Sequence, residues 1–370
     1  MIRVLHVVTY MGRGGLETML MNYYRAIDRE KVQFDFLVHR DFRADYDDEI
    51  ELLGGRIYRI PTLNPFSLNY RKALNRFFAE HKEYKIVHVH QDCMSSVILK
   101  AAKKNCVPIR VAHSHSASQT KNLKYLIKLY YRQQIPQYAT HLMACSEEAG
   151  KWMFGKADYE ILSNAINAQA YRYDVAVRKE VRNSLGIPGN QLLIGHVGNF
   201  SEPKNHSFLI DVFYQIQKKA DAKLLLIGGK NLKLDSVSIM DNMKQKVFDL
   251  GLADKVIFAG TRPDVNKLLQ AVDVFVFPSK YEGLPVATIE AQATGLICLF
   301  SDRVPIECKI TNLVHQISLE KGAEFWAERI IELSNYSRRD TYQEIVQSGF
   351  DIQKNATRLQ EFYLKVEAEN

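Results

Sequence analysis

The residues most suited to chemistry in this chain are two glutamates, Glu282 and Glu290, which lie eight positions apart. Ionised carboxylates only accept hydrogen bonds, so two of them in one site could hold the hydroxyl groups of a sugar. The alternative is an unrelated pair, with one exposed acid on a loop and one on a helix surface. The Tyr-Glu-Gly-Leu-Pro segment that starts at Tyr281, directly after Phe-Pro-Ser, favours the sugar-binding interpretation.

The segments on either side of the pair predict a strand, a short loop and a helix. Residues 273–279 form a short apolar run that ends at a proline, which predicts a buried strand. Pro285 and the alanine-rich residues up to Gly295 predict a helix with a glycine stop. This unit directs free backbone N–H groups and the positive end of a helix toward a phosphate. Glu282 would lie on the loop, and Glu290, in the second turn of the helix, would reach the same cleft.

A second candidate loop contains Gly14 and Gly15, directly before a predicted helix. Glycines there let the backbone pass close to a phosphate or a sugar, and the helix start adds its dipole. Glu17 occupies the last glycine position of the dinucleotide-binding pattern, so that type of site is excluded. A tight turn without a ligand is the alternative.

His113 and His115 lie at the end of the predicted strand 109–113, again on the side where a cleft is expected. Two histidines at positions i and i+2 could bind a metal, but no acidic or cysteine partner has ligand spacing. We therefore predict no metal site. His90 is expected to support the site or to be structural.

The composition is that of an ordinary globular protein, with 46% hydrophobic and 25% charged residues among 370. This length is sufficient for two domains, each with its own core. No run of about 18 apolar residues occurs and the N-terminus has no signal-peptide pattern, so we expect no membrane span. Five widely spaced cysteines are expected to be buried thiols in a reducing compartment, not disulfides or metal ligands.

Strand-like runs alternate with helical patterns along the chain, which predicts two copies of a parallel sheet with helices on both faces. We expect a first domain of residues 1–164, a second of residues 165–351 and a C-terminal helical segment of residues 352–370. The clearest predicted strands are residues 4–9, 34–38, 86–90 and 109–113 in the first domain, and 192–197, 223–227, 256–258, 274–277 and 297–300 in the second.

Positive charge is concentrated in the first domain. Residues 1–164 contain 24 Lys and Arg but 17 Asp and Glu, so the net charge of +7 lies entirely there. One side of a helix would carry a basic stripe, interleaved with aliphatic and aromatic residues: Lys121, Lys124, Lys128 and Arg132. The stripe suits a helix lying on an anionic membrane, and an ordinary solvated face is the alternative. We expect an anionic partner of this domain, either a membrane surface or a phosphate-bearing lipid.

Five segments resemble those of the retaining, nucleotide-sugar-dependent family 4 glycosyltransferases, most closely those of bacterial capsular and exopolysaccharide assembly, and they occur in the family's order. The first four are residues 12–17, 145–148, 197–205 and 250–262. The fifth contains Glu282 and Glu290, which look like the family's Glu-x7-Glu motif. The resemblance implies an α/β fold of the GT-B type, with two Rossmann-like domains whose parallel sheets face a central cleft. It implies an N-terminal acceptor domain, a C-terminal nucleotide-sugar donor domain and a last helix that crosses back to the first domain.

The resemblance also implies roles for the candidate residues. Glu282 would hold hydroxyls of the donor sugar, and Glu290 would hold those of the ribose. His113 would support charge at the sugar, with His115 as the alternative because the strand register is uncertain by two residues. The remaining residues expected around the nucleotide sugar are Gly14, Gly15, Gly283, Leu284, Pro285 and Val286.

Lys204 resembles the family's cation that neutralises the leaving diphosphate. A solvated surface position is the alternative. The family usually has an arginine at the position of Asn199, so a bidentate clamp on phosphate is replaced by a neutral amide. Either Arg262 or Arg13 supplies the positive charge that Asn199 lacks, or diphosphate binding is weaker, or the activity is impaired. Arg262 itself is expected in the nucleotide pocket.

We therefore expect an enzyme that moves a sugar, with retention, from a nucleotide diphosphate (UDP by preference) to a lipid-diphosphate-linked saccharide. It would need no metal and no cofactor, bind no nucleic acid, and act in the cytoplasm, peripherally on the inner face of the membrane. The alternatives are a GT-B relative with other chemistry, such as a phosphorylase or a nucleotide-sugar epimerase, and a catalytically weak binding subunit that needs a partner.

Overall fold

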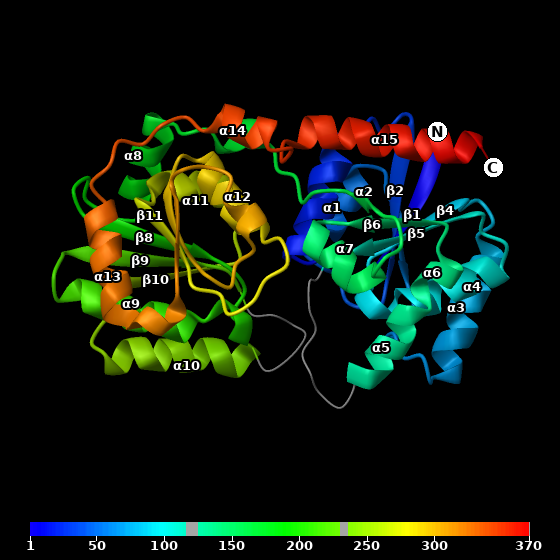
Figure 1. Ribbon diagram of the computed structural model, residues 1–370, viewed down its shortest axis with the longest axis horizontal. Coiled ribbons are helices and arrows are strands. Elements are labelled where there is room, and N and C mark those ends of the chain that lie inside the picture. The colour runs from blue at the N-terminus through cyan, green and yellow to red at the C-terminus, as the bar shows by residue number, and fades with distance from the viewer. Residues whose placement is uncertain (116–124, 230–235, 370) are drawn as a thin grey trace. The chain divides into compact units, whose positions relative to one another are not determined.

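The protein is described by a computed structural model that covers residues 1–115, 125–229 and 236–369. Its contacts divide the chain into two compact units (Figure 1). The first consists of Met1–Ala165 together with Asp351–Asn370, and the second of Ile166–Phe350. Each unit is a parallel sheet with helices packed around it, as the alternation of strand and helix patterns predicts.

The first unit has a seven-stranded sheet in the order β3-β2-β1-β4-β5-β6-β7. Its strands are β1 (Ile2–Val8), β2 (Val32–Val38), β3 (Ile57–Arg59), β4 (Ile86–Val89), β5 (Ile109–Ser114), β6 (His141–Ala144) and β7 (Glu160–Ile161). Its helices include α1 (Gly15–Ala26), α2 (Asp47–Leu52), α3 (Leu68–Glu80), α4 (Ser95–Lys104), α5 (Tyr125–Gln133), α6 (Ile135–Tyr138) and α7 (Glu147–Phe154).

The last helix, α15 (Ile352–Ala368), belongs to this first unit and packs beside α1 (Figure 1). Its buried apolar residues Ile352, Ala356, Leu359, Tyr363 and Val366 recur at intervals of three and four positions, which places them on one face. That face joins the same core as β1, β2 and α1. The C-terminal segment therefore completes the core of the unit in which the chain begins.

The second unit has a six-stranded sheet in the order β10-β9-β8-β11-β12-β13. Its strands are β8 (Leu192–Val197), β9 (Ala222–Ile227), β10 (Val256–Gly260), β11 (Val274–Phe277), β12 (Ile297–Ser301) and β13 (Val314–Ile317). Its helices include α8 (Val175–Ser184), α9 (His206–Gln217), α10 (Ser236–Asp249), α11 (Val265–Ala271), α12 (Val286–Ala293), α13 (Gly322–Leu333) and α14 (Tyr342–Gln347).

Each sheet contains a position where the strand order reverses. In the first unit the chain builds outward from β1 to β3 and then returns to place β4 on the other side of β1. In the second unit β8 and β11 are the corresponding neighbours. Loops that leave the carboxyl ends of two such strands diverge and leave a crevice, which is where α/β proteins bind ligands.

Among the described residues, no helix combines the length and the apolar character that crossing a bilayer requires.

Candidate active site

The site in the second unit is built from the two loops at the reversal of strand order. Residues 198–205 leave the carboxyl end of β8, and residues 278–285 leave the carboxyl end of β11. The first loop carries Asn199 and Lys204, and the second carries Glu282. Because β8 and β11 are neighbours in the sheet, the two loops lie next to each other although they are far apart in sequence.

Lys204 and Glu282 form an ion pair across these loops, with 2.6 Å between Nζ of the lysine and Oε1 of the glutamate. Both side chains are mostly enclosed, with exposed fractions of 19% and 12%. The ammonium group also lies 4.6 Å from the centre of the Phe277 ring, an attractive contact for a cation. The structure therefore brings together the two residues for which the sequence predicts separate roles toward sugar and diphosphate.

A second, more exposed ion pair connects the same loops, but here the cation is on the β11 loop and the anion on the β8 loop. Lys280, on the β11 loop, pairs with Glu202 on the β8 loop. The backbone N–H of Lys280 donates to the carbonyl of Pro203 at 2.8 Å, and Asn205 Nδ2 donates to the carbonyl of Pro278 at 3.1 Å. The two hydrogen bonds, which do not involve the Lys280 and Glu202 side chains, connect the β8 and β11 loops directly.

Close backbone packing supports the β8 loop from the side of β9. Gly228 has a φ of +146°, and a Cβ atom there would lie 2.1 Å from the carbonyl oxygen of Gly198. A Cβ on Gly198 would in turn lie 3.2 Å from Cδ of Lys204. Glycine at these two positions lets the loops approach and leaves room for the lysine side chain.

Two buried histidines, His196 and His206, lie close enough to Lys204 for its charge to act on them, and no sequence motif indicated them. His196 bonds through Nδ1 to the carbonyl of Val276 at 2.8 Å, and the ring of His206 stacks on Phe200 with 4.2 Å between centres. Burial lowers the pKa of His196 to about 4 and lowers that of His206 well below its ordinary value. Lys204 is therefore the charged group of this cluster, and the histidines are neutral packing partners.

The helix α12 begins at Val286, with Pro285 as its N-terminal cap residue. Its N-terminus directly follows the β11 loop, which carries Glu282. The backbone N–H and the hydroxyl of Thr288 both donate hydrogen bonds to the carbonyl of Pro285, the hydroxyl at 2.7 Å. The positive end of the helix is therefore only a few residues along the chain from Glu282, while the donors of Thr288 are already engaged.

Glu290 lies in α12 and is buried, with 7% of its surface exposed. The hydroxyl of Tyr171 donates a hydrogen bond to its Oε1 at 2.6 Å. Burial raises the pKa of Glu290 to about 7, and the bond from Tyr171 acts in the opposite direction. Tyr171 lies 119 positions earlier in the chain, so no local pattern could connect it with Glu290.

The raised pKa of Glu290 predicts a pH-dependent stability. The folded state keeps the proton up to about pH 7, whereas an unfolded glutamate loses it near 4.5, so the wild type loses stability as the pH rises between these values. The loss should reach about 3 kcal/mol, at 1.36 kcal/mol per pKa unit. We expect the free energy of unfolding of Glu290→Gln, measured in urea, to rise by this amount relative to wild type across that window.

The exposed Glu324 on α13 offers a matched control in the same unit. Glu324→Gln should change the free energy of unfolding by a small amount that does not grow between about pH 4.5 and about pH 7. A constant difference between Glu290→Gln and wild type over that range would contradict the buried, protonated carboxyl.

Asn199 and Arg262 are two further candidates in the second unit. Asn199 is partly buried on the β8 loop. Arg262 is exposed, and its guanidinium forms a bidentate pair with Asp264, at 2.7 and 2.6 Å. Arg262 can therefore contact a ligand phosphate only by sharing or leaving Asp264.

In the first unit, Gly14 and Gly15 form the turn into α1, as the sequence predicts. Gly15 has open space where a side chain would be, whereas a Cβ on Gly14 would meet the carboxylate of Glu17 at 2.3 Å. Glu17 is buried in the first turn of the helix. Arg13, on the same loop, lies 4.8 Å from the centre of the Tyr46 ring.

His113 is buried on β5, and His115 follows the end of that strand with partial exposure. Burial lowers the pKa of His115 to about 3. It lowers that of His113 well below the ordinary value, although a contact with the Leu162 backbone acts in the opposite direction. Both rings are therefore neutral, and they lie 4.0 Å apart. His90 lies beside them, with 2.9 Å between its Nδ1 and Nε2 of His115.

The basic stripe is only partly described, because Lys121 and Lys124 lie outside the described residues. Lys128 and Arg132 lie on α5, which also exposes Leu126 and Tyr130. Arg132 donates a hydrogen bond to the carbonyl of Trp152 at 2.9 Å, and its guanidinium lies 5.1 Å from the centre of the Trp152 ring. Arg132 therefore attaches α5 to α7, in addition to carrying charge.

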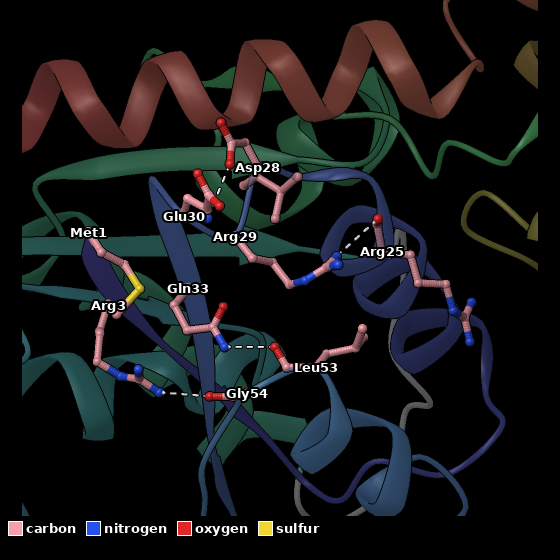
Figure 2. A pocket seen from close by; sticks show the side chains of 10 residues that line it. Met1, Arg3, Arg25, Asp28, Arg29, Glu30, Gln33, Leu53 and Gly54 are labelled. Carbon is pink, nitrogen blue, oxygen red and sulfur yellow. Dashed lines mark hydrogen bonds between the residues drawn. The ribbon is translucent and has the colours of Figure 1, made fainter.

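A surface depression of about 630 Å³ lies at the opposite end of the first sheet, beside the amino ends of β1 and β2 (Figure 2). Its arginines are already engaged. Arg3 is bound to Asp35 at 2.6 Å and Arg25 to Glu49 at 2.6 Å, while Arg29 donates to backbone carbonyls of α1. Each arginine that lines the depression therefore already has a partner within the protein.

Known families match both units of the chain. Residues 13–169 match the family described as Glycosyltransferase Family 4, and residues 177–349 match Glycosyl transferases group 1. The putative glycosyltransferase EpsF of Bacillus subtilis is 36% identical, over 98% of this chain and 96% of that protein. The Staphylococcus aureus capsular polysaccharide biosynthesis glycosyltransferase CapH is 23% identical, over 98% and 99%.

A further relative is the Escherichia coli UDP-Gal:alpha-D-GlcNAc-diphosphoundecaprenol alpha-1,3-galactosyltransferase, which is 22% identical over 98% of this chain and 97% of that protein. Among solved structures, Anabaena HepE in complex with UDP-glucose has a TM-score of 0.81 at 17% identity, covering 99% of this chain and 100% of that one. WaaG, a glycosyltransferase involved in lipopolysaccharide biosynthesis, has a TM-score of 0.68 at 15% identity, over 97% and 95%. These similarities show the GT-B fold.

Proposed function

The chain belongs to the glycosyltransferases that join a family 4 segment to a group 1 segment, and on this premise we propose that it transfers a sugar from a UDP-sugar to a lipid-diphosphate-linked saccharide in polysaccharide assembly. The observation that carries the proposal is the Lys204–Glu282 pair beside the start of α12. A cation and a helix N-terminus suit a diphosphate, and a carboxylate next to them suits sugar hydroxyls. UDP is favoured because UDP or UDP-sugars appear with HepE and in the name of the E. coli relative.

In this mechanism the leaving group is the nucleoside diphosphate, so the barrier depends on how well its developing negative charge is stabilised. Lys204 and the N–H groups at the start of α12 would supply that stabilisation. Glu282 would accept hydrogen bonds from the sugar and hold Lys204 in place. Glu290 would accept from the ribose hydroxyls, and its neighbour Tyr171 would orient the carboxyl group.

The remaining assignments extend the proposal to the first unit. His113, neutral because it is buried, would support positive charge on the reacting sugar carbon, with His115 as the alternative. The turn at Gly14 and Gly15 would let the backbone approach the acceptor or the donor phosphate. Retention of the anomeric configuration and independence from metal ions in the transfer step belong to the same proposal.

The test is incubation of the purified protein with a panel of UDP-, GDP- and ADP-sugars, with a lipid-diphosphate-linked saccharide as acceptor. Transfer from one donor, or its slow hydrolysis without acceptor, supports the proposal. Formation of an epimer of the donor, or release of a sugar phosphate in the presence of phosphate, indicates other GT-B chemistry. Tight binding of a donor without any turnover indicates a binding subunit.

Asn199 provides a separate prediction about the diphosphate. A guanidinium at this position would form two parallel hydrogen bonds to phosphate that an amide does not. We expect Asn199→Arg to tighten the binding of UDP about tenfold, an effect of about 1.4 kcal/mol, while the binding of uridine stays the same. Isothermal titration calorimetry measures both, and equal effects on the two ligands would show that residue 199 does not face the diphosphate.

We further propose that the enzyme works peripherally at the inner face of the cell membrane, where the proposed lipid-linked acceptor would be bound. The exposed Leu126 and Tyr130 beside Lys128 suit an interfacial helix. Replacing Lys121, Lys124 and Lys128 by glutamine should weaken binding to anionic vesicles by about 3 kcal/mol, at about 1 kcal/mol per basic residue. Vesicle sedimentation measures the change, and high salt should weaken the wild type in the same way.

Arg132 is kept in this variant because it also bonds to Trp152, so its removal would change the attachment of α5 as well as the charge. The matched control replaces three other exposed lysines of the first unit, Lys72, Lys104 and Lys156, which removes the same charge. If control and test variants sediment equally, the binding reflects overall charge and not this helix. Nucleotide binding should remain unchanged in both variants.

A further inference from the structure

Five histidines gather inside the first unit, at the position where the strand order reverses. His6 lies on β1, His88 on β4 and His113 on β5, while His90 and His115 directly follow the ends of β4 and β5. His6 and His88 are partners in the register of neighbouring strands. Three strands therefore converge on one group of imidazoles.

Hydrogen bonds connect three of these rings in a row. Nδ1 of His6 lies 3.0 Å from Nε2 of His90, and Nδ1 of His90 lies 2.9 Å from Nε2 of His115. A neutral imidazole has one N–H donor and one acceptor nitrogen, so such a row has a direction. If His90 donates from Nε2 to His6, its Nδ1 presents a lone pair toward His115.

The cluster has many polar atoms without partners. Within the described residues, five of its buried ring nitrogens have no hydrogen-bond partner: Nε2 of His6, Nε2 of His88, both nitrogens of His113 and Nδ1 of His115. An unsatisfied buried polar group costs about 1–3 kcal/mol. Apolar residues of the same size would pack on β1, β4 and β5 without this cost, which points to a ligand for these nitrogens.

Two groups of three histidines have ring nitrogens within 4.8 Å of one another. The inner group is His6, His88 and His90, all fully enclosed. The rings of His88 and His90 stack there at 4.4 Å with 21° between their planes, so their lone pairs do not converge on one point. Nδ1 of His88 is also held by the hydroxyl of Tyr363 at 2.6 Å. The inner group is therefore not arranged to share an ion.

The outer group is His90, His113 and His115. The planes of its rings are inclined to one another by 37–46°, and His115 is partly exposed, which provides access. Two ligand nitrogens on a tetrahedral zinc ion lie about 3.4 Å apart, given Zn–N bonds of about 2.1 Å. The 2.9 Å between His90 and His115 needs only a small opening to reach that value.

We propose that His90, His113 and His115 bind a divalent transition-metal ion of the zinc class, with one coordination position left open toward solvent. Imidazole nitrogens suit zinc, copper, nickel and cobalt ions and not magnesium or calcium. Neutral imidazole is the form that ligates a metal ion. His6 would act as the positioning residue, because its bond to Nε2 of His90 orients Nδ1 of that ring toward the ion.

His113 also has a role in the proposed function, but this test measures metal binding, so its outcome is distinguishable from that of the sugar-transfer assay. The test uses full-length, untagged protein freed of metal by a chelator and titrated with Co²⁺. A site with three nitrogen ligands and an open position should give the visible d–d absorption of tetrahedral cobalt and saturate at a single ion per chain. Zn²⁺ should displace the cobalt and abolish the absorption.

His115→Gln removes one ligand at a partly exposed position, where glutamine is tolerated, and should weaken cobalt binding by at least about 100-fold. His6→Phe keeps all three ligands but removes the orienting bond, and should weaken binding about 10–100-fold. Phenylalanine suits this position because the ring of His6 already packs on Phe34 and Phe36.

His141→Gln is the matched control, since His141 lies on β6 of the same unit, partly exposed and outside the cluster. It should bind cobalt like the wild type. Absence of the tetrahedral absorption in the wild type, or equal cobalt affinity in wild type and His115→Gln, would overturn the metal site and leave a hydrogen-bonded histidine network. A fall in affinity for His115→Gln and His6→Phe but not for His141→Gln supports it.

Discussion

Glu282→Gln should lower the rate of sugar transfer about 10–150-fold. Glutamine keeps the shape of the side chain but accepts hydrogen bonds without a charge, and a charged bond contributes about 1.5–3 kcal/mol. The substitution also leaves the ammonium of Lys204 without the carboxylate that holds it at 2.6 Å. We expect the loss mainly in kcat, measured as steady-state transfer from the active donor, because the sugar and the departing diphosphate are both affected in the transition state.

The neighbouring ion pair provides a matched control for this prediction. Glu202 connects the same two loops through Lys280, but both side chains are largely exposed, with fractions of 62% and 44%. Exposed pairs contribute little to stability, so Glu202→Gln should transfer sugar at nearly the wild-type rate. Equal rates for Glu282→Gln and wild type would show that this glutamate does not contact the donor sugar.

Lys204→Gln should have the larger effect, with a decrease of about 10²–10³-fold in kcat. This is the range observed when a group that stabilises developing negative charge is removed, and a partly enclosed lysine acts in a lower dielectric than water. The binding of UDP should weaken as well, whereas that of uridine should not, because only the diphosphate contacts the cation. Calorimetry with the two ligands separates this role from a general disturbance of the pocket.

The double variant Lys204→Gln/Glu282→Gln tests whether the pair acts as a unit. Residues in direct contact have non-additive effects, so the double variant should be less impaired than the product of the two single decreases. Lys280→Gln, which removes the exposed cation of the neighbouring pair, should leave kcat nearly unchanged. A full additive loss in the double variant would show that Lys204 and Glu282 act independently.

The local elements of the second unit could be predicted from the sequence, because each depends on neighbouring residues. The apolar run before Pro278 predicts β11, and the proline and glycine at the ends of the next segment predict α12, which the structure has at Val286–Ala293. The family could be identified in the same way, because its motifs are short segments in a defined order. Short edge strands such as β3 and β7 were not predicted, since two or three residues carry no periodic pattern.

The contacts within the site could not be predicted in this way. Lys204 and Glu282 are 78 positions apart, and Tyr171 and Glu290 are 119 positions apart. The sequence therefore predicts Lys204 as a ligand of phosphate, but not its bond to Glu282. It predicts Glu290 as a ligand of ribose, but not the burial that raises the pKa of this carboxyl to about 7.

The histidines illustrate the same division most clearly. From the sequence, His113 and His115 lack partners at ligand spacing, and a metal site was not predicted. The fold brings them to His90, because β4 and β5 are neighbours, and to His6, because β1 pairs with β4. By itself, the sequence determined the alternation of strands and helices, the family and the loops that carry the candidate residues. The tertiary structure alone decided which side chains meet, because those contacts depend on strand order and register, which bring together segments far apart in the chain.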